Sequence, residues 1–304
     1  MFAPLLCAVS MCFADIRDEV SHGYASNTDV RIHYASVGKG PLVIMIHGFP
    51  DYWYTWRHQM AALKDNFRVV AIDQRGYNLS SKPEGVSRYA MPDLVADVAA
   101  VIRHLGESRA VIVGHDWGGS VAWNFAFSHP EMVDKLIILN LPHPTGMMRT
   151  IASNPEARAN TGYAQVFREK GPDDPTVFFG GPMTPQSLSG WVRDREARPH
   201  YVAAFERSDF AAMLNFYKAN YPAPDQASAM TPVAPARVAS PTLIFHGLAD
   251  TALHSDGLNN TWDWIDADTT IVAVPGAGHF VQQDAAELVS STMKWWLLAR
   301  SAGN

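Results

Sequence analysis

The sequence predicts an α/β fold in which a mostly parallel central sheet is flanked by helices and carries an inserted helical cap. Short, continuous apolar runs alternate with helical patterns, as expected for strands buried on both faces and joined by crossover helices. Between two of these runs, apolar residues at 94–105 fall on one helical stripe. One long interval, 143–238, has no comparable run, and its aromatic helical patches predict the cap.

Six buried strands are expected from the apolar runs. They are Leu42–Ile46, Val69–Ile72, Val111–Val113, Leu136–Leu139, Thr242–Phe245 and Ile271–Val274. The runs divide the chain into a sheet-bearing core, residues 15–142 and 239–304, and a cap, residues 143–238. An irregular loop of the cap's length would be unusual. Near its end the prolines predict an extended return to the sheet; these are Pro222, Pro224, Pro232 and Pro235.

Composition limits the possible partners. The chain has 304 residues, of which 47% are hydrophobic, enough for one sizeable core with a smaller insertion. A formal net charge of −6 and scattered lysines and arginines argue against a nucleic-acid partner. No apolar stretch is long enough to span a bilayer. No cluster of histidines and cysteines predicts a metal site.

The first segment, residues 1–14, differs from the rest of the chain. It is apolar, contains both cysteines, Cys7 and Cys12, and ends before the charged stretch that begins at Asp15. This pattern resembles the end of a secretory signal cleaved after Ala14, although no lysine or arginine precedes the apolar run. Removal would predict a periplasmic or secreted protein without cysteines. A frayed or mis-started amino terminus would instead predict a cytoplasmic protein.

A glycine-rich turn follows the strand Val111–Val113 directly. It reads Gly-His-Asp-Trp-Gly-Gly over 114–119 and precedes an apolar helix, the pattern of a nucleophile elbow with Asp116 at its centre. Side chains at the flanking positions would clash where the strand turns so sharply into the helix. The carboxylate would stand at the positive end of the helix dipole.

An aspartate at this position selects the chemistry. A carboxylate cannot usefully exchange acyl groups with an ester, but it can displace a leaving group at a saturated carbon. The product is an alkyl ester of Asp116, which water must then cleave. A serine-type esterase is excluded, because the turn offers no hydroxyl or thiol at its centre.

Two later loops supply the expected base and acid. His279 lies in a glycine-rich loop after the strand Ile271–Val274 and suits a general base for the hydrolytic water. Asp250 follows the strand Thr242–Phe245 and suits the acid that orients this histidine. The order nucleophile, acid, histidine is the one expected for α/β-hydrolases. Asn140, at the other place where the acid could stand, cannot carry the charge, and His246 lies too early in the chain.

Backbone N–H groups of Phe49 and Trp117 are expected to form an oxyanion hole. Phe49 belongs to the His-Gly-Phe-Pro stretch after the strand Leu42–Ile46, and Trp117 follows the nucleophile. Such donors can contribute ~3 kcal/mol each to stabilising the developing charge. His47 is expected to be structural, with its ring tied into the loop.

The chain resembles epoxide hydrolases of the α/β-hydrolase fold from His22 onward. The resemblance rests on the stretches His47–Pro50, Trp53–Gln59, Asp73–Tyr77, Gly114–Gly119 and Pro142–Pro144. Together these stretches are far more specific than any one alone.

The resemblance implies two cap tyrosines that hydrogen-bond the epoxide oxygen and protonate it as charge develops. They match Tyr163 and Tyr217, although amphipathic packing of the cap would also explain both rings. Phe49, Trp117 and Phe216 are expected to contact the substrate. The implied reaction gives a vicinal diol from a small apolar epoxide, in a monomer or homodimer that needs neither metal nor organic cofactor.

Three alternatives stay open at this point. A haloalkane or haloacid dehalogenase would use the same aspartate. The haloalkane enzyme would be expected to carry Asn in place of Phe49, and a fluoroacetate enzyme to carry arginines near the nucleophile, where this chain has Trp117 and Ser120. A ligand-binding module that reuses the fold would be expected to lack at least one catalytic position, and none is missing.

Overall fold

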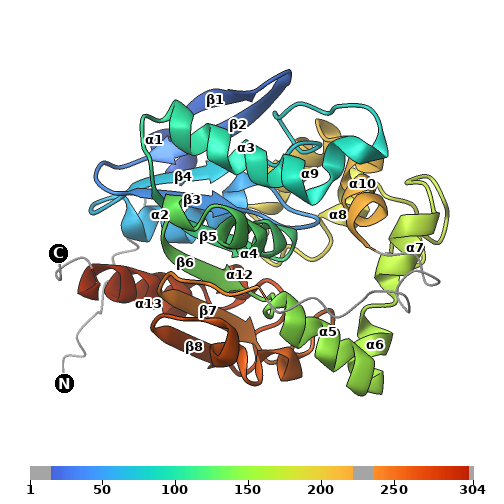
Figure 1. Cartoon of the computed structure of the whole chain (residues 1–304). Coiled ribbons are helices and arrows are strands. Elements are labelled where there is room, and N and C mark those ends of the chain that lie inside the picture. The colour runs from blue at the N-terminus through green and yellow to red at the C-terminus, as the bar shows by residue number, and fades with distance from the viewer. Residues whose placement is uncertain (1–14, 222–235, 301–304) are drawn as a thin grey trace, which may run out of the picture.

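The computed structural model describes residues 15–221 and 236–300, and its centre is a mostly parallel sheet (Figure 1). The described residues form eight strands in the order β1-β2-β4-β3-β5-β6-β7-β8. All neighbours from β4 to β8 are parallel, whereas β2 pairs antiparallel with both β1 and β4. The strands are β1 (Ser21–Asn27), β2 (Val30–Val37), β3 (Leu42–Ile46), β4 (Arg68–Ile72), β5 (Ala110–His115), β6 (Val133–Leu139), β7 (Thr242–Gly247) and β8 (Thr269–Val274).

Each of the six predicted runs lies within one of the strands β3 to β8. The prediction that every run is buried on both faces is wrong for β8, where Ile271 and Val272 are only partly buried. The reason is its position, because β8 is an edge strand with a single neighbour, β7. The antiparallel pair β1 and β2 was not predicted. Most of β1 is exposed or partly exposed, so its sequence lacks a continuous apolar run.

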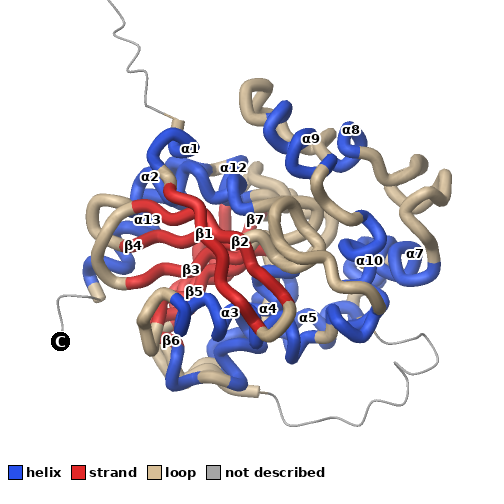
Figure 2. The backbone as a smooth tube through the Cα atoms, turned by 90° about the horizontal axis from the view of Figure 1, so that it is seen from above, coloured by secondary structure: helices blue, strands red, loops and turns tan. Residues whose placement is uncertain are grey.

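Helices cover both faces of the sheet. The predicted helical stripe belongs to α3, which packs against α4, while α13 packs against α2 (Figures 1 and 2). The helices of this part are α1 (Ile16–Glu19), α2 (Arg57–Leu63), α3 (Met91–His104), α4 (Trp117–Ser128), α12 (Val281–Asp284) and α13 (Ala286–Ala299). Short 3-10 helices are η1 (Trp53–Trp56), η2 (Val86–Tyr89), η3 (Pro130–Met132), η4 (Ser255–Leu258) and η5 (Thr261–Trp264).

The chain between β6 and β7 is helical in the part that the structure describes. Its helices are α5 (Pro144–Ser153), α6 (Pro155–Asn160), α7 (Tyr163–Glu169), α8 (Pro185–Leu188), α9 (Arg198–Glu206) and α10 (Phe210–Asn220). In both views α7 to α10 lie to one side of the sheet (Figures 1 and 2). Buried side chains of this segment join the same hydrophobic cluster as the sheet, so the cap packs directly on the core.

Three of the predictions concern domain boundaries or residues outside the described part of the chain. The domain boundaries at residues 143 and 238 stay predictions. The proline-rich return, from Pro222 to Pro235, and the first 14 residues with both cysteines lie outside the described residues. Among the described helices, none combines the length and apolar character that a membrane crossing requires.

Candidate active site

The predicted site residues gather at one edge of the sheet. Phe49 follows β3, Asp116 follows β5, Asp250 follows β7 and His279 follows β8. Because these strands are parallel, their carboxyl ends meet at the same edge, where crevices of open α/β sheets bind ligands. Asn140, which follows β6, lies there too.

Asp116 occupies a strained turn between β5 and α4. Its backbone φ is +51°, a value that non-glycine residues rarely adopt. A Cβ atom at Gly114 would lie 2.2 Å from the carbonyl oxygen of Gly118, and one at Gly118 would lie 2.1 Å from that of Ile46. The backbones are therefore too close for any side chain at these two positions, which is the role that the sequence predicted for the glycines.

The Asp116 carboxylate is buried and faces two groups of the predicted site. The N–H of Phe49 donates a hydrogen bond of 2.7 Å to Oδ1, and Nε2 of His279 lies 3.5 Å from Oδ2. Burial alone would raise the pKa of this carboxyl, but His279, His115 and the Phe49 N–H together hold the pKa below its ordinary value. The group is thus kept ionised, as a nucleophile requires.

Asp250 orients His279 from the other side. Its Oδ2 accepts a 2.9 Å hydrogen bond from Nδ1 of His279, while its Oδ1 accepts from the N–H groups of Ala252 and Leu253 at 2.8 and 3.1 Å. Burial opposes the charge of Asp250, but these partners lower its pKa. Burial likewise disfavours the charged histidine, yet the charges of Asp250 and Asp116 raise the pKa of His279 to about 10.

Two polar residues that were not assigned a site role complete this contact. Asn140 donates a 2.7 Å hydrogen bond to Oδ2 of Asp250, so it supports the acid although it cannot replace it. His115 donates from Nε2 to the carbonyl oxygen of His279 at 2.7 Å. Burial, together with the charge of His279, lowers the pKa of His115 to about 4, which keeps this donor ring neutral. Their positions, at the end of β6 and inside the glycine-rich turn, were the available sequence signals.

Phe49 and Trp117, the predicted oxyanion donors, lie after β3 and at the start of α4, respectively. The Phe49 N–H already points at the Asp116 carboxylate, and Trp117 is the first residue of α4, where backbone N–H groups have no partner within the helix. His47 is tied into its loop, because Nδ1 donates to the Gly48 carbonyl oxygen and Nε2 accepts from the Gln74 N–H.

A cavity of about 530 Å³ opens onto Asp116. The two predicted tyrosines line it from opposite helices, Tyr163 from α7 and Tyr217 from α10, with ring centroids 6.2 Å apart. Burial raises the pKa of both phenols well above the ordinary value, so both stay protonated. The other lining residues are Phe49, Pro50, Asp116, Asn160, Phe167, Phe178, Phe179, Ser187, Gly190, Trp191, Thr251, Ala252, His279 and Phe280.

Two residues expected to contact the substrate do not line this cavity. The Phe216 side chain is fully buried and packs against Tyr77 and Trp117, with ring centroids 5.6 and 5.7 Å away. Successive residues of a helix point about 100° apart, and here Tyr217 faces the cavity while Phe216 points away from it. The Trp117 ring lies against the Tyr217 ring, 5.0 Å between centroids, and supports that tyrosine instead.

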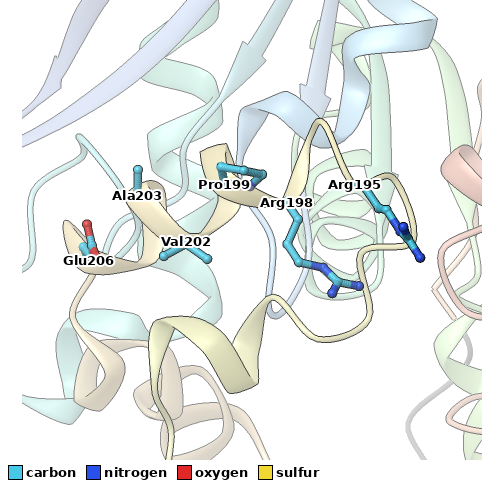
Figure 3. A pocket seen from close by; sticks show the side chains of 6 residues that line it. All are labelled: Arg195, Arg198, Pro199, Val202, Ala203 and Glu206. Carbon is cyan, nitrogen blue, oxygen red and sulfur yellow. The ribbon is translucent and has the colours of Figure 1, made fainter.

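The described residues also form a second hollow, against α9, that has none of this chemistry (Figure 3). It is lined by Arg195, Arg198, Pro199, Val202, Ala203 and Glu206. No predicted site residue reaches it, and it is open to solvent. The cavity above Asp116 is therefore the candidate active site.

Comparison with known proteins agrees with this geometry. The family model described as alpha/beta hydrolase fold matches residues 41–286. Epoxide hydrolase 1 of Caenorhabditis elegans is 34% identical over 287 residues, which cover 90% of this chain and 69% of the relative. Epoxide hydrolase 3 of Xenopus tropicalis is 31% identical, covering 91% of this chain and 77% of its own.

Solved structures give the same result. A variant of an epoxide hydrolase from Bacillus megaterium superposes with a TM-score of 0.82 at 30% identity, over 91% of this chain and all of that one. A variant of the enzyme from Solanum tuberosum gives 0.74 at 26% identity, over 92% of this chain and all of its own. The chain belongs to the α/β-hydrolase fold family. Within this family it is a member of the epoxide hydrolases.

Proposed function

We propose that the protein opens an epoxide with water to a vicinal diol through a covalent ester on Asp116. The observation that carries the proposal is the contact of three groups at one cavity. Asp116 lies 3.5 Å from Nε2 of His279, whose Nδ1 lies 2.9 Å from Asp250. The reaction class of the relatives supports the choice of substrate.

In the first step the Asp116 carboxylate attacks one carbon of the epoxide ring. The C–O bond of the ring breaks, and the electron pair stays on the epoxide oxygen. Tyr163 and Tyr217 donate hydrogen bonds to that oxygen, and one of them transfers its proton. The raised pKa of both phenols suits this role, because only a protonated phenol can donate to a strongly basic alkoxide.

In the second step His279 removes a proton from water, which attacks the ester carbonyl carbon. The N–H groups of Phe49 and Trp117 hold the negative charge on the carbonyl oxygen. The imidazolium then protonates the departing diol oxygen, and Asp250 stabilises it meanwhile. The proton set free as Asp116 becomes a carboxylate again returns to the tyrosine pair, so the net reaction adds one water.

The charges of the site order these two steps. In the free enzyme both carboxylates raise the pKa of His279 to about 10, so the ring is protonated and cannot act as a base. Ester formation removes the charge of Asp116, one of the two causes of this shift. The pKa of His279 then falls toward its ordinary value, the ring releases its proton to solvent, and the neutral histidine can act as a base on the ester. When Asp116 regains its charge at the end of the cycle, His279 takes a proton back from solvent.

A dehalogenase on the same aspartate is the second candidate, and no observation on the site favours it. The N–H of Phe49 contacts Asp116, but the Phe49 side chain offers no polar group for a halide. The cavity presents two phenols, which suit an oxygen leaving group that must be protonated. A ligand-binding module would not need the Asp116–His279–Asp250 contact. Measuring halide release from a chloroalkane and diol formation from an epoxide distinguishes the three candidate functions. Diol alone favours the epoxide hydrolase, halide favours the dehalogenase, and neither product favours the binding module.

Isotope labelling tests the covalent step. Excess enzyme is mixed with styrene oxide in heavy-oxygen water for a single turnover, and the peptides are then analysed by mass. We expect the label in the peptide that contains Asp116 and not in the first diol formed, because water attacks the carbonyl carbon of the ester. Label in the first diol would mean direct hydration and would refute the ester. Enzyme incubated without styrene oxide is the control.

A further inference from the structure

One residue of the cavity wall has an unfavourable backbone conformation and an exposed apolar side chain. Phe179 has a φ of +48°, and its side chain is 80% exposed, more than any other exposed large hydrophobic residue in the described part of the chain. A bulky aromatic residue at positive φ is a conformational outlier, and its exposure leaves the fold little apolar burial in return. Folding therefore does not account for the choice of phenylalanine here.

The local turn would accept a different residue more readily. Phe178 and Gly181 pair through two backbone hydrogen bonds of 2.8 and 3.1 Å, which leaves Phe179 and Gly180 as a two-residue turn. Both central residues have positive φ, as in type I′ turns, where Asn-Gly is strongly preferred. Strain kept at a surface position is characteristic of functional sites.

The Phe179 ring begins a continuous series of aromatic contacts that ends beside the nucleophile. It lies 4.9 Å from the Phe178 ring and 6.4 Å from the Phe167 ring, centroid to centroid. Phe167 in turn lies 5.0 Å from Tyr217 and 5.2 Å from Phe49. All five rings line the same cavity. An apolar surface thus leads from the exposed Phe179 inward to the residues around Asp116.

We propose that Phe179 is a specificity-determining residue that covers the outer part of the substrate, an aryl or similarly large apolar group attached at some distance from the epoxide ring. This inference rests on the proposed function and adds the substrate class. Binding of such a group would remove both it and the exposed ring from water, which is favourable. A small epoxide that reaches only Asp116 and the tyrosines would gain nothing from Phe179.

The test compares phenyl glycidyl ether with 1,2-epoxypropane in the variant Phe179→Asn, which keeps the turn and removes the ring. We expect the ratio of kcat/KM for the aryl epoxide to that for the small epoxide to fall about tenfold, chiefly through KM. Because asparagine suits positive φ, the Tm should stay the same or rise. Phe179→Tyr should keep most of the ratio. Trp295→Ala, which removes an exposed aromatic ring from α13, is the matched control and should leave the ratio as in the wild type.

Each outcome has a distinct meaning. An unchanged ratio in Phe179→Asn, or an equal loss for both epoxides, would overturn this inference while the proposed function stands. A wild-type protein that hydrolyses neither epoxide would overturn the proposed function and this inference with it.

Discussion

Replacing Asp250 by asparagine should separate the two chemical steps. The Asp250 carboxylate accepts four hydrogen bonds, from the N–H groups of Ala252 and Leu253, from Asn140 and from His279. An asparagine amide has one oxygen, which the two backbone N–H groups require. Its NH₂ group must then face Asn140, another donor, and Nδ1 of His279.

This arrangement places the histidine proton on the wrong nitrogen. Nδ1 of His279 must accept from the new amide, so the proton moves to Nε2, the atom that has to take a proton from water. The corresponding substitution in a serine protease triad costs about 10⁴-fold. We therefore expect ester hydrolysis to slow by ~10³–10⁴-fold, or about 4–5.5 kcal/mol of barrier. Alkylation of Asp116 should change far less, because it does not need a neutral histidine.

Intact-protein mass spectrometry during turnover of styrene oxide measures both steps. The Asp250→Asn variant should accumulate a covalent adduct of one substrate mass, whereas the wild type should show little. Asn140→Ala removes only one of the four hydrogen bonds and should slow hydrolysis about tenfold, near the lower end of the range for bonds to charged groups. The double variant Asp250→Asn with Asn140→Asp returns a carboxylate to the pair and should recover part of the rate. Wild-type hydrolysis in Asp250→Asn would refute the orientation argument.

Three further predictions follow from the same contacts. Tyr163→Phe and Tyr217→Phe should each slow adduct formation ~10–100-fold in single-turnover experiments, and together ~10³-fold or more; a full rate in the double variant would remove the phenols from the mechanism. The free energy of unfolding should depend on His279 most strongly below its unfolded pKa of about 6.5. Because its folded pKa is raised to about 10, the stability it contributes is lost as pH rises through that value. Urea denaturation should therefore show a gap between wild type and His279→Gln that narrows from pH 6 to pH 10.5, and a constant gap would contradict the shift. Gly118→Ala should destabilise the protein by about 3 kcal/mol or prevent folding, because the added Cβ would lie 2.1 Å from the backbone oxygen of Ile46. Gly171→Ala is the control: a Cβ at position 171 would have open space around it, so this variant should keep a Tm close to that of the wild type in thermal denaturation.

Local sequence patterns were sufficient for most of the fold. The runs that became β3 to β7 are buried on both faces, so an unbroken apolar stretch was enough to identify each strand. The pair β1 and β2 escaped prediction because neither strand carries an unbroken apolar run. Most of β1 is exposed or partly exposed, and the buried positions of β2 are interrupted by Arg31 and include His33. For β8 the apolar run identified the strand but overstated its burial, because an edge strand has only one neighbour to cover it.

The residues of the candidate site were also readable from the chain, because each follows a strand whose carboxyl end must meet the others. Asp116, with its small neighbours, and His279 needed no structure to be found. The sequence by itself thus determined that Asp116, Asp250 and His279 follow strands in this order, which predicts a carboxylate nucleophile, an acid and a histidine base.

Tertiary structure decided which side chains surround Asp116, Asp250 and His279. Only the packing of the cap shows that Tyr217 faces the cavity while Phe216 is buried behind it. Only the pairing of β6 with β7 brings Asn140 to Asp250. It also brings Phe179, distant in sequence from the nucleophile, to the wall of the same cavity. The physical reason is that a turn or strand is specified by residues that are neighbours in the sequence. The direction in which an aromatic side chain points depends instead on how its helix is rotated and packed against distant residues, which no local pattern encodes.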